Sequence, residues 1–190
     1  RYSSSAASDV YKRQPDDLKN PEIVTSMINV GPDMTFEVDH CGDGEHLAIC
    51  LHGFPEHSFS WRYQLPMLAK LGFTAWAPNL RGYGNTTRPS AVKDYSLRAL
   101  VEDVAQLIIA SGKKRVTLIG HDWGGFIAWE FAIINRLPLE RLIVCNCPHP
   151  RSFFDDFGWS QLRKSWYMFF FQIPWIPEYF SCLLYTSPSP

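Results

Sequence analysis

The sequence predicts an α/β fold in which a mostly parallel β-sheet carries helices on both faces. Short apolar runs rich in β-branched residues alternate with stretches of helical spacing, a pattern typical of parallel strands joined by right-handed crossovers. Residues 47–51 (Leu-Ala-Ile-Cys-Leu) are apolar without a break, which is typical of a strand covered on both faces. Polar segments that contain glycine follow three of the predicted strands. Ligands of such folds bind beyond the carboxyl ends of the strands, so these segments form the candidate site.

Composition limits the classes of function. The chain has 190 residues, of which 46% are hydrophobic and 15% aromatic, enough for one domain with a substantial core. The 18 basic and 19 acidic residues leave a net charge of −1, so we expect no binding to nucleic acid or to an anionic membrane. No run reaches the ~18 apolar residues that a membrane helix needs, and no apolar leader is visible.

The cysteines indicate a reduced, cytoplasmic protein, because their number, five, is odd and no pair has the C-x-x-C spacing. Cys145, Cys147 and His149 alternate at a spacing of two and could together hold a metal ion. A fourth ligand is not in view, so a strand and its exit explain this pattern better, and we expect no metal.

The first half of the chain predicts a hairpin followed by a strand–helix–strand unit. Residues 24–30 and 34–38 are partly alternating strands around a Gly-Pro-Asp turn. After the buried strand over 47–51, residues 60–71 have helical spacing despite Pro66, and 73–77 are the next strand.

The second half continues the alternation. An amphipathic helix is expected over residues 96–110, capped by Ser96 and stopped at Gly112. Three further elements are predicted in order: a strand over 116–119, a helix over 126–134 and a strand over 141–145.

Residues 120–125 (Gly-His-Asp-Trp-Gly-Gly) form the sharp turn between the strand and the helix. Their pattern, small-x-nucleophile-x-small, is that of a nucleophile elbow, with Asp122 in the place that serine takes in esterases. The glycines suit a strained backbone in which a neighbouring Cβ would collide. The helix N-terminus also favours an ionised carboxylate at this position. The alternative interpretation is that Asp122 merely caps the helix.

Three motifs carry a family resemblance. Residues 52–56 (His-Gly-Phe-Pro-Glu), 81–84 (Arg-Gly-Tyr-Gly) and 120–125 resemble, in order and spacing, the α/β-hydrolase-fold epoxide hydrolases. The resemblance covers about residues 22–180 and implies an α/β-hydrolase fold, truncated at the start of a helical cap. The expected domains are the first part of the core over 15–149 and the start of the cap over 150–181.

Both ends of the chain are expected to be non-native. Residues 1–14 and 182–190 resemble translated sequencing-adapter read-through, so we expect about residues 15–181 to be genuine and to be a piece of a longer protein.

An aspartate nucleophile restricts the substrate. A carboxylate that attacks a saturated carbon forms an alkyl ester, which water can cleave at the carbonyl, whereas serine would form a stable ether. Asp122 therefore indicates an epoxide or an alkyl halide. The resemblance implies the first: an apolar epoxide is opened to a vicinal diol by water, without a cofactor.

The resemblance also assigns roles to individual residues. The backbone N–H groups of Phe54 and Trp123 would form the oxyanion hole, with the Phe54–Pro55 bond in cis. Tyr167, in the aromatic segment 166–174, matches one of two cap tyrosines that protonate the oxirane oxygen; otherwise it is a core or interface aromatic residue. The other motif residues expected around the pocket are His52, Gly53, Pro55 and His121.

The chain departs from the family in what it lacks. None of its six histidines stands where the family has its late catalytic base, Asn146 stands where some dehalogenases carry the acid, and the second cap tyrosine is absent. We therefore expect an incomplete, inactive enzyme. Two alternatives remain open: a haloalkane dehalogenase, in which Trp123 would hold the halide, and a non-catalytic binding module on this fold.

Overall fold

The computed structural model describes residues 21–151. The chain divides into two units, Arg1–Cys147 and Pro148–Pro190, and the first unit contains all the strands and helices described here. Tyr167 and the two ends expected to be non-native lie outside the described residues.

The predicted hairpin is confirmed. Strand β1 (Val24–Gly31) pairs antiparallel with β2 (Met34–Cys41), in a register that sets Val24 opposite His40. A β-bulge between Asn29 and Gly31 shifts this register next to the turn.

Six strands of residues 21–151 form one mixed, mostly parallel sheet in the order β1-β2-β4-β3-β5-β6. Strand β2 pairs antiparallel with β4, while β3 pairs parallel with β4 and β5, and β5 pairs parallel with β6. The strands beyond the hairpin are β3 (His46–Leu51), β4 (Phe73–Pro78), β5 (Arg115–His121) and β6 (Arg141–Cys145).

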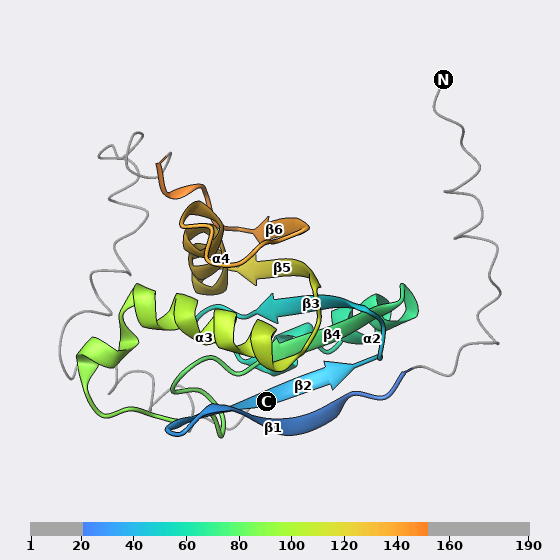
Figure 1. The fold of residues 1–190 in the computed structure, drawn as a ribbon, viewed down its shortest axis with the longest axis horizontal. Helices are drawn as coiled ribbons and strands as arrows, with labels where there is room; N and C mark the ends of the chain where they lie inside the picture. Colours follow the sequence, from blue (N-terminus) through green and yellow to red (C-terminus); the bar gives the residue numbers. More distant parts are fainter. Residues whose placement is uncertain (1–20, 152–190) are drawn as a thin grey trace, which may run out of the picture. The chain divides into compact units, whose positions relative to one another are not determined.

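Helices cover both faces of this sheet, as predicted (Figure 1). Alternate residues of β3 belong to different cores. Leu47 and Ile49 pack with α3 (Leu97–Ala110) and α4 (Trp123–Ile133), whereas Ala48 packs with α2 (Gln64–Lys70). All six residues of β3 are buried, which confirms the prediction made from its continuous apolar run.

Two helix boundaries differ from the prediction. Instead of one helix over 60–71, a 3₁₀ helix η2 (Ser58–Trp61) precedes α2, which begins at Gln64. Pro66 therefore lies in the first turn of α2, where a missing N–H removes no intrahelical bond. Helix α4 begins at Trp123 rather than at residue 126, because the two glycines after Trp123 are themselves helical.

Helix α3 agrees with the prediction: the Ser96 Oγ accepts a hydrogen bond from the Ala99 N–H at 3.4 Å.

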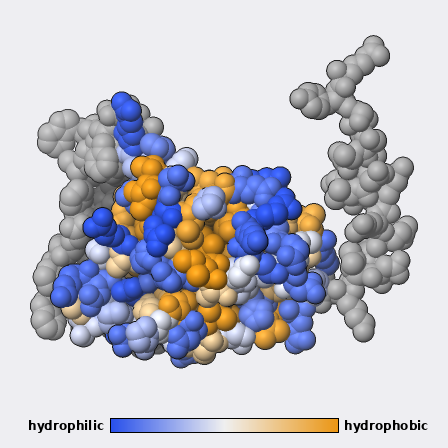
Figure 2. Space-filling view, viewed as in Figure 1, coloured by the Kyte–Doolittle hydropathy of each residue, from blue (hydrophilic) through white to orange (hydrophobic). Residues whose placement is uncertain are grey.

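The surface mixes polar and apolar side chains. On the face shown in Figure 2, apolar side chains gather near the middle and hydrophilic ones surround them. None of the described helices is long and apolar enough to span a membrane.

Candidate active site

The parallel register brings three strand ends to the same level at one edge of the sheet. Leu51 of β3 is paired with Gly120 of β5, and His121 of β5 is paired with Cys145 of β6. The segments that follow these strands therefore start side by side, although they are far apart in the sequence. This edge carries the motifs that contain His52 and Asp122.

Asp122 occupies a strained turn between β5 and α4. Its φ of 51° and ψ of −119° lie outside the regions that non-glycine residues favour, at a cost of about 1–3 kcal/mol. The backbone is fixed on both sides, since the Asp122 N–H donates to the Cys145 carbonyl at 3.3 Å and the Asp122 carbonyl accepts from the Phe126 N–H at 3.0 Å. The side chain makes no capping hydrogen bond to α4. The interpretation of Asp122 as a simple helix cap is therefore wrong.

The glycines of the elbow are required by close packing. A Cβ on Gly120 would lie 2.4 Å from the Gly124 carbonyl oxygen, and a Cβ on Gly124 would lie 2.4 Å from the Leu51 carbonyl oxygen. Real Cβ atoms do not approach backbone atoms this closely, so α4 can start directly against the end of β3 only with glycine at both positions.

The carboxylate of Asp122 is turned toward the loop after β3. Its Oδ2 accepts a hydrogen bond from the Phe54 backbone N–H at 3.0 Å. The Phe54–Pro55 peptide is cis. The Trp123 N–H is the first of α4 and has no carbonyl one turn back in the helix to receive it. The structure thus brings Asp122 and Phe54 together, with Trp123 next in sequence to Asp122.

The residue that donates to this carboxylate and the residue that follows Asp122 both carry aromatic side chains. Phe54 is 46% exposed and Trp123 is 51% exposed, and the Trp123 ring packs edge-on against Phe126 at 6.0 Å between centroids.

His121 links the elbow to two residues for which the sequence predicted no role in the site. Its Nδ1 lies 3.0 Å from the Glu56 Oε2, and its Nε2 lies 3.3 Å from the Asn146 Nδ2. Because an amide nitrogen only donates, Nε2 is the acceptor and Nδ1 carries the proton toward the carboxylate. The place of Glu56 in the His-Gly-Phe-Pro-Glu motif was the available signal. The position of Asn146 was noted from the sequence, but its contact with His121 follows only from the pairing of β6 with β5.

His52 is completely buried below the same loop. The Leu80 N–H donates to its Nε2 at 3.0 Å, and its Nδ1 lies 2.8 Å from the Gly53 carbonyl oxygen. Removal from solvent lowers the pKa of this imidazole, while the hydrogen bond to Gly53 acts in the opposite direction. Burial thus favours the neutral ring.

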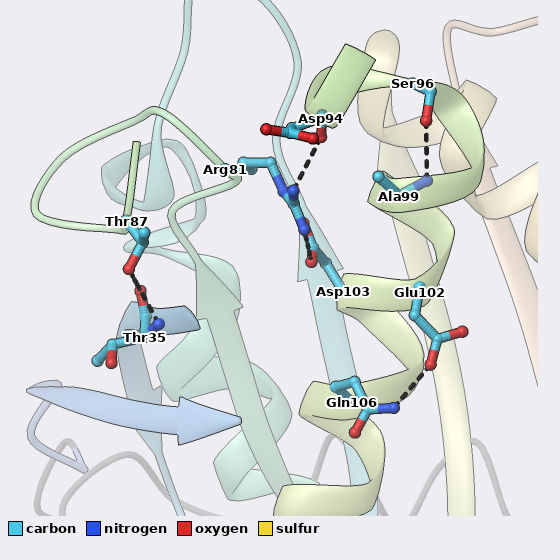
Figure 3. Close-up of polar contacts among 9 residues, drawn as sticks. All are labelled: Thr35, Arg81, Thr87, Asp94, Ser96, Ala99, Glu102, Asp103 and Gln106. Carbon is cyan, nitrogen blue, oxygen red and sulfur yellow. Dashed lines mark hydrogen bonds and ion pairs between the residues drawn. The ribbon is translucent and has the colours of Figure 1, made fainter. Parts of the chain in front are cut away.

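The loop after β4 is fastened to α3 by an ion pair (Figure 3). The Arg81 Nε donates to the Asp103 Oδ2 at 2.8 Å, and a second guanidinium nitrogen contacts the other carboxylate oxygen. The Arg81 Nη1 also donates to the Asp94 carbonyl at 2.8 Å. Hydrogen bonding to Asp103 raises the pKa of Arg81. This pairing holds the Arg-Gly-Tyr-Gly motif against the body of the protein.

A second carboxylate holds the same loop to β2. The Glu37 Oε2 accepts from the Asn79 Nδ2 at 2.6 Å and from the Asn85 N–H at 3.0 Å, and the Asn85 Nδ2 donates to the Glu37 Oε1 at 2.6 Å. The Asn79 Oδ1 in turn accepts from the buried Ser58 N–H at 2.8 Å. Glu37 therefore connects β2 with the loops that follow β3 and β4.

The charge of Asp122 affects its neighbours. Burial raises the pKa of the Tyr83 hydroxyl, and the negative charge of Asp122 raises it further. The pKa of the Cys147 thiol is raised for the same two reasons, burial first. Both groups are therefore kept neutral around the carboxylate.

Across residues 21–151 no three His, Cys, Asp or Glu side chains are grouped so that they could hold a metal ion.

The chain is similar to known proteins in sequence. Residues 49–171 match the family described as alpha/beta hydrolase fold. Among curated proteins, the chain is 45% identical over 138 residues to Epoxide hydrolase 2 of Caenorhabditis elegans and to Epoxide hydrolase 4 of Homo sapiens. Each match covers 72% of this chain and 38% of the relative, so the chain spans less than half the length of these proteins.

The chain is also similar to solved structures of epoxide hydrolases. A Bacillus megaterium epoxide hydrolase, the F128A mutant with its product (R)-3-[1]naphthyloxy-propane-1,2-diol, matches with a TM-score of 0.72 at 34% identity. That match covers 81% of this chain and 54% of the other. An epoxide hydrolase of Vigna radiata matches with a TM-score of 0.63 at 34% identity, over 67% of this chain and 39% of the other.

Proposed function

Since the chain belongs to the alpha/beta hydrolase fold family, we propose that it carries the nucleophile and part of the oxyanion hole of an epoxide hydrolase, with Asp122 as the attacking residue. One observation carries this proposal: the Asp122 carboxylate does not cap its helix and instead accepts a hydrogen bond from the Phe54 N–H. A purely structural aspartate at this turn would need neither that contact nor a strained φ.

The first step forms a covalent ester. One oxygen of Asp122 attacks an oxirane carbon from the side opposite the C–O bond, that bond breaks, and its electron pair goes to the oxirane oxygen. The oxygen takes a proton from a phenol, the role assigned to Tyr167; an ordinary phenol, with a pKa of about 10, stays protonated at neutral pH. With Oδ2 engaged by Phe54, the other oxygen, Oδ1, is the one available for attack.

The second step hydrolyses the ester. Water attacks the ester carbonyl carbon, and the negative charge that develops on Oδ2 is stabilised by the Phe54 and Trp123 N–H groups, each worth about 3 kcal/mol in such sites. Cleavage of the acyl C–O bond releases the diol, and the proton left behind returns to the phenolate. No histidine of residues 21–147 is hydrogen-bonded to the Asp122 carboxylate, so the proposal assigns activation of the water to a base outside that range.

Two other functions fit less well. A haloalkane dehalogenase would need a side-chain donor beside Trp123 to hold the departing halide, and Phe54 offers none. A binding module would have no use for a carboxylate held in a strained turn against a backbone donor.

Isotope labelling tests the covalent step. A version of the protein extended to the length of the curated relatives is allowed a single turnover of an epoxide in ¹⁸O-water. The mass of the peptide that contains Asp122 is then measured by mass spectrometry. Since water attacks the carboxyl carbon, the label should enter Asp122, and neither Asp122→Ala nor Asp122→Ser should form diol. Label found only in the diol would mean direct attack of water on the epoxide, which contradicts the proposal.

A further inference from the structure

We propose that His52 is a positioning residue which, as the neutral ring with its proton on Nδ1, orients the Gly53–Phe54 peptide so that the Phe54 N–H points at Asp122. This inference rests on the proposed function, because it explains how that function's oxyanion donor is held in place.

The hydrogen bonds of the imidazole determine its tautomer. A backbone N–H can only donate, so the Leu80 N–H, 3.0 Å from the His52 Nε2, requires a lone pair on that nitrogen. The proton of the neutral ring is therefore on Nδ1, which donates to the Gly53 carbonyl at 2.8 Å. Burial disfavours a second proton, and that proton would also face the Leu80 N–H.

The acceptor of this proton belongs to the same peptide group as the catalytic donor. The Gly53 carbonyl and the Phe54 N–H lie in one rigid trans peptide plane and point in opposite directions. The Gly53 carbonyl also accepts from the Glu56 N–H at 3.1 Å. Two donors therefore hold the oxygen side of the plane, and this fixes the direction of the N–H that lies 3.0 Å from the Asp122 Oδ2. Donation to the carbonyl also polarises the peptide, which strengthens its N–H as a donor.

The ring is itself held from outside the loop. Leu80 belongs to the segment after β4, and the Tyr83 ring of that segment packs edge-on against the imidazole with 4.7 Å between centroids. His52 thus transmits the position of the Arg-Gly-Tyr-Gly loop to the peptide that faces Asp122. Few side chains could replace it, because the role needs an acceptor and a donor at fixed positions on one rigid ring.

Two substitutions separate these contacts. In His52→Asn, the amide nitrogen can take the place of Nδ1 and keep the bond to Gly53, while the acceptor for Leu80 is lost. In His52→Gln, the amide oxygen can reach the Leu80 N–H, while the donor to Gly53 is lost. Each variant loses one hydrogen bond of the same buried ring, so similar losses of thermal stability are expected, and the two serve as controls for each other.

The expected effect falls on hydrolysis of the ester more than on its formation. Loss of one oxyanion donor costs about a hundredfold or more in kcat, and a displaced donor should cost about tenfold to a hundredfold. In a version of the protein extended to the length of the curated relatives, His52→Gln should therefore accumulate the Asp122 alkyl ester, detected by intact-protein mass spectrometry. His52→Asn should accumulate much less of it.

Each outcome decides a different point. Equal kinetic effects in the two variants, or unchanged hydrolysis in His52→Gln, would overturn the positioning role of His52. Failure of the unsubstituted protein to form any adduct on Asp122 would overturn the proposed function and this inference with it. If His52→Gln does not fold, ¹⁵N NMR of the imidazole in the unsubstituted chain decides: a proton on Nδ1 alone supports the inference, and a proton on Nε2 overturns it.

Discussion

Gly53 lies directly against Asp122. A Cβ built on Gly53 would stand 2.5 Å from the Cβ of Asp122 and 2.7 Å from its Oδ2. Because no real Cβ contact is this short, any side chain at position 53 must displace the Asp122 carboxylate from the Phe54 N–H. The glycine of the His-Gly-Phe-Pro-Glu motif is thus required by the nucleophile of another motif, and not only by its own loop.

Gly53→Ala should reduce the rate of diol formation far more than it reduces thermal stability. The added methyl group pushes Asp122 out of position, and a misplacement of about 1 Å can cost about a hundredfold in rate. In a version of the protein extended to the length of the curated relatives, diol formation and the midpoint of thermal unfolding should be compared with those of Gly31→Ala, a position where a Cβ meets nothing within 4 Å. Equal activity in the two variants would show that the Asp122 position does not matter for turnover.

Substrate class can be tested directly. Styrene-type or fatty epoxides should be converted to diols by a version of the protein extended to the length of its relatives, while chloroalkanes and bromoalkanes should release no halide. The reason is that the Phe54 side chain cannot donate a hydrogen bond to a departing halide. Halide release as fast as epoxide opening, measured on the same preparation, would reverse this ranking.

Two arginine–carboxylate pairs of similar geometry should differ in their effect on stability. Arg81 and Asp103 have side chains 14% and 7% exposed, whereas Arg115 and Glu140 are 60% and 37% exposed. Asp103→Asn leaves a buried guanidinium without its counter-charge, and we expect a loss of about 3 kcal/mol in the free energy of unfolding. Glu140→Gln should have a far smaller effect, because water solvates both partners of that pair. Urea denaturation of the two variants checks the order.

Glu37 should make stability depend on acid pH. The Asn85 N–H is the largest cause that lowers its folded pKa, and the side chains of Asn85 and Asn79 add to it. A lowered folded pKa contributes stability that is present above the unfolded value of about 4.3 and is lost as the pH falls through the folded value. The stability difference between wild type and Glu37→Gln should therefore be largest near neutrality and shrink below about pH 4.

The control for this series is Glu45→Gln, since the Glu45 side chain is 94% exposed and should give only a small difference at any pH. A Glu37→Gln difference that stays constant down to pH 3 would show that the loop is not held by the ionised carboxylate.

Elements whose signals are local can be predicted from the amino-acid sequence alone. The hairpin turn, the Ser96 cap of α3, the continuous apolar run of β3 and the strand–Asp122–helix turn each depend on residues within a few positions of one another. Periodicity reports which face of an element is buried, and turn chemistry reports where it ends, so these features need no knowledge of distant segments. The candidate nucleophile was found in the same way.

Which segments contact one another depends on the packing of the whole fold. Strand β4 lies between β2 and β3, and this order brings the Asn79–Asn85 loop to Glu37. The parallel register of β3 and β5 brings the Phe54 N–H to Asp122, and the packing of α3 brings Asp103 to Arg81. Local pattern cannot specify these contacts, because a buried face shows that it is covered but not by what. The partner is chosen by the packing of all the layers together.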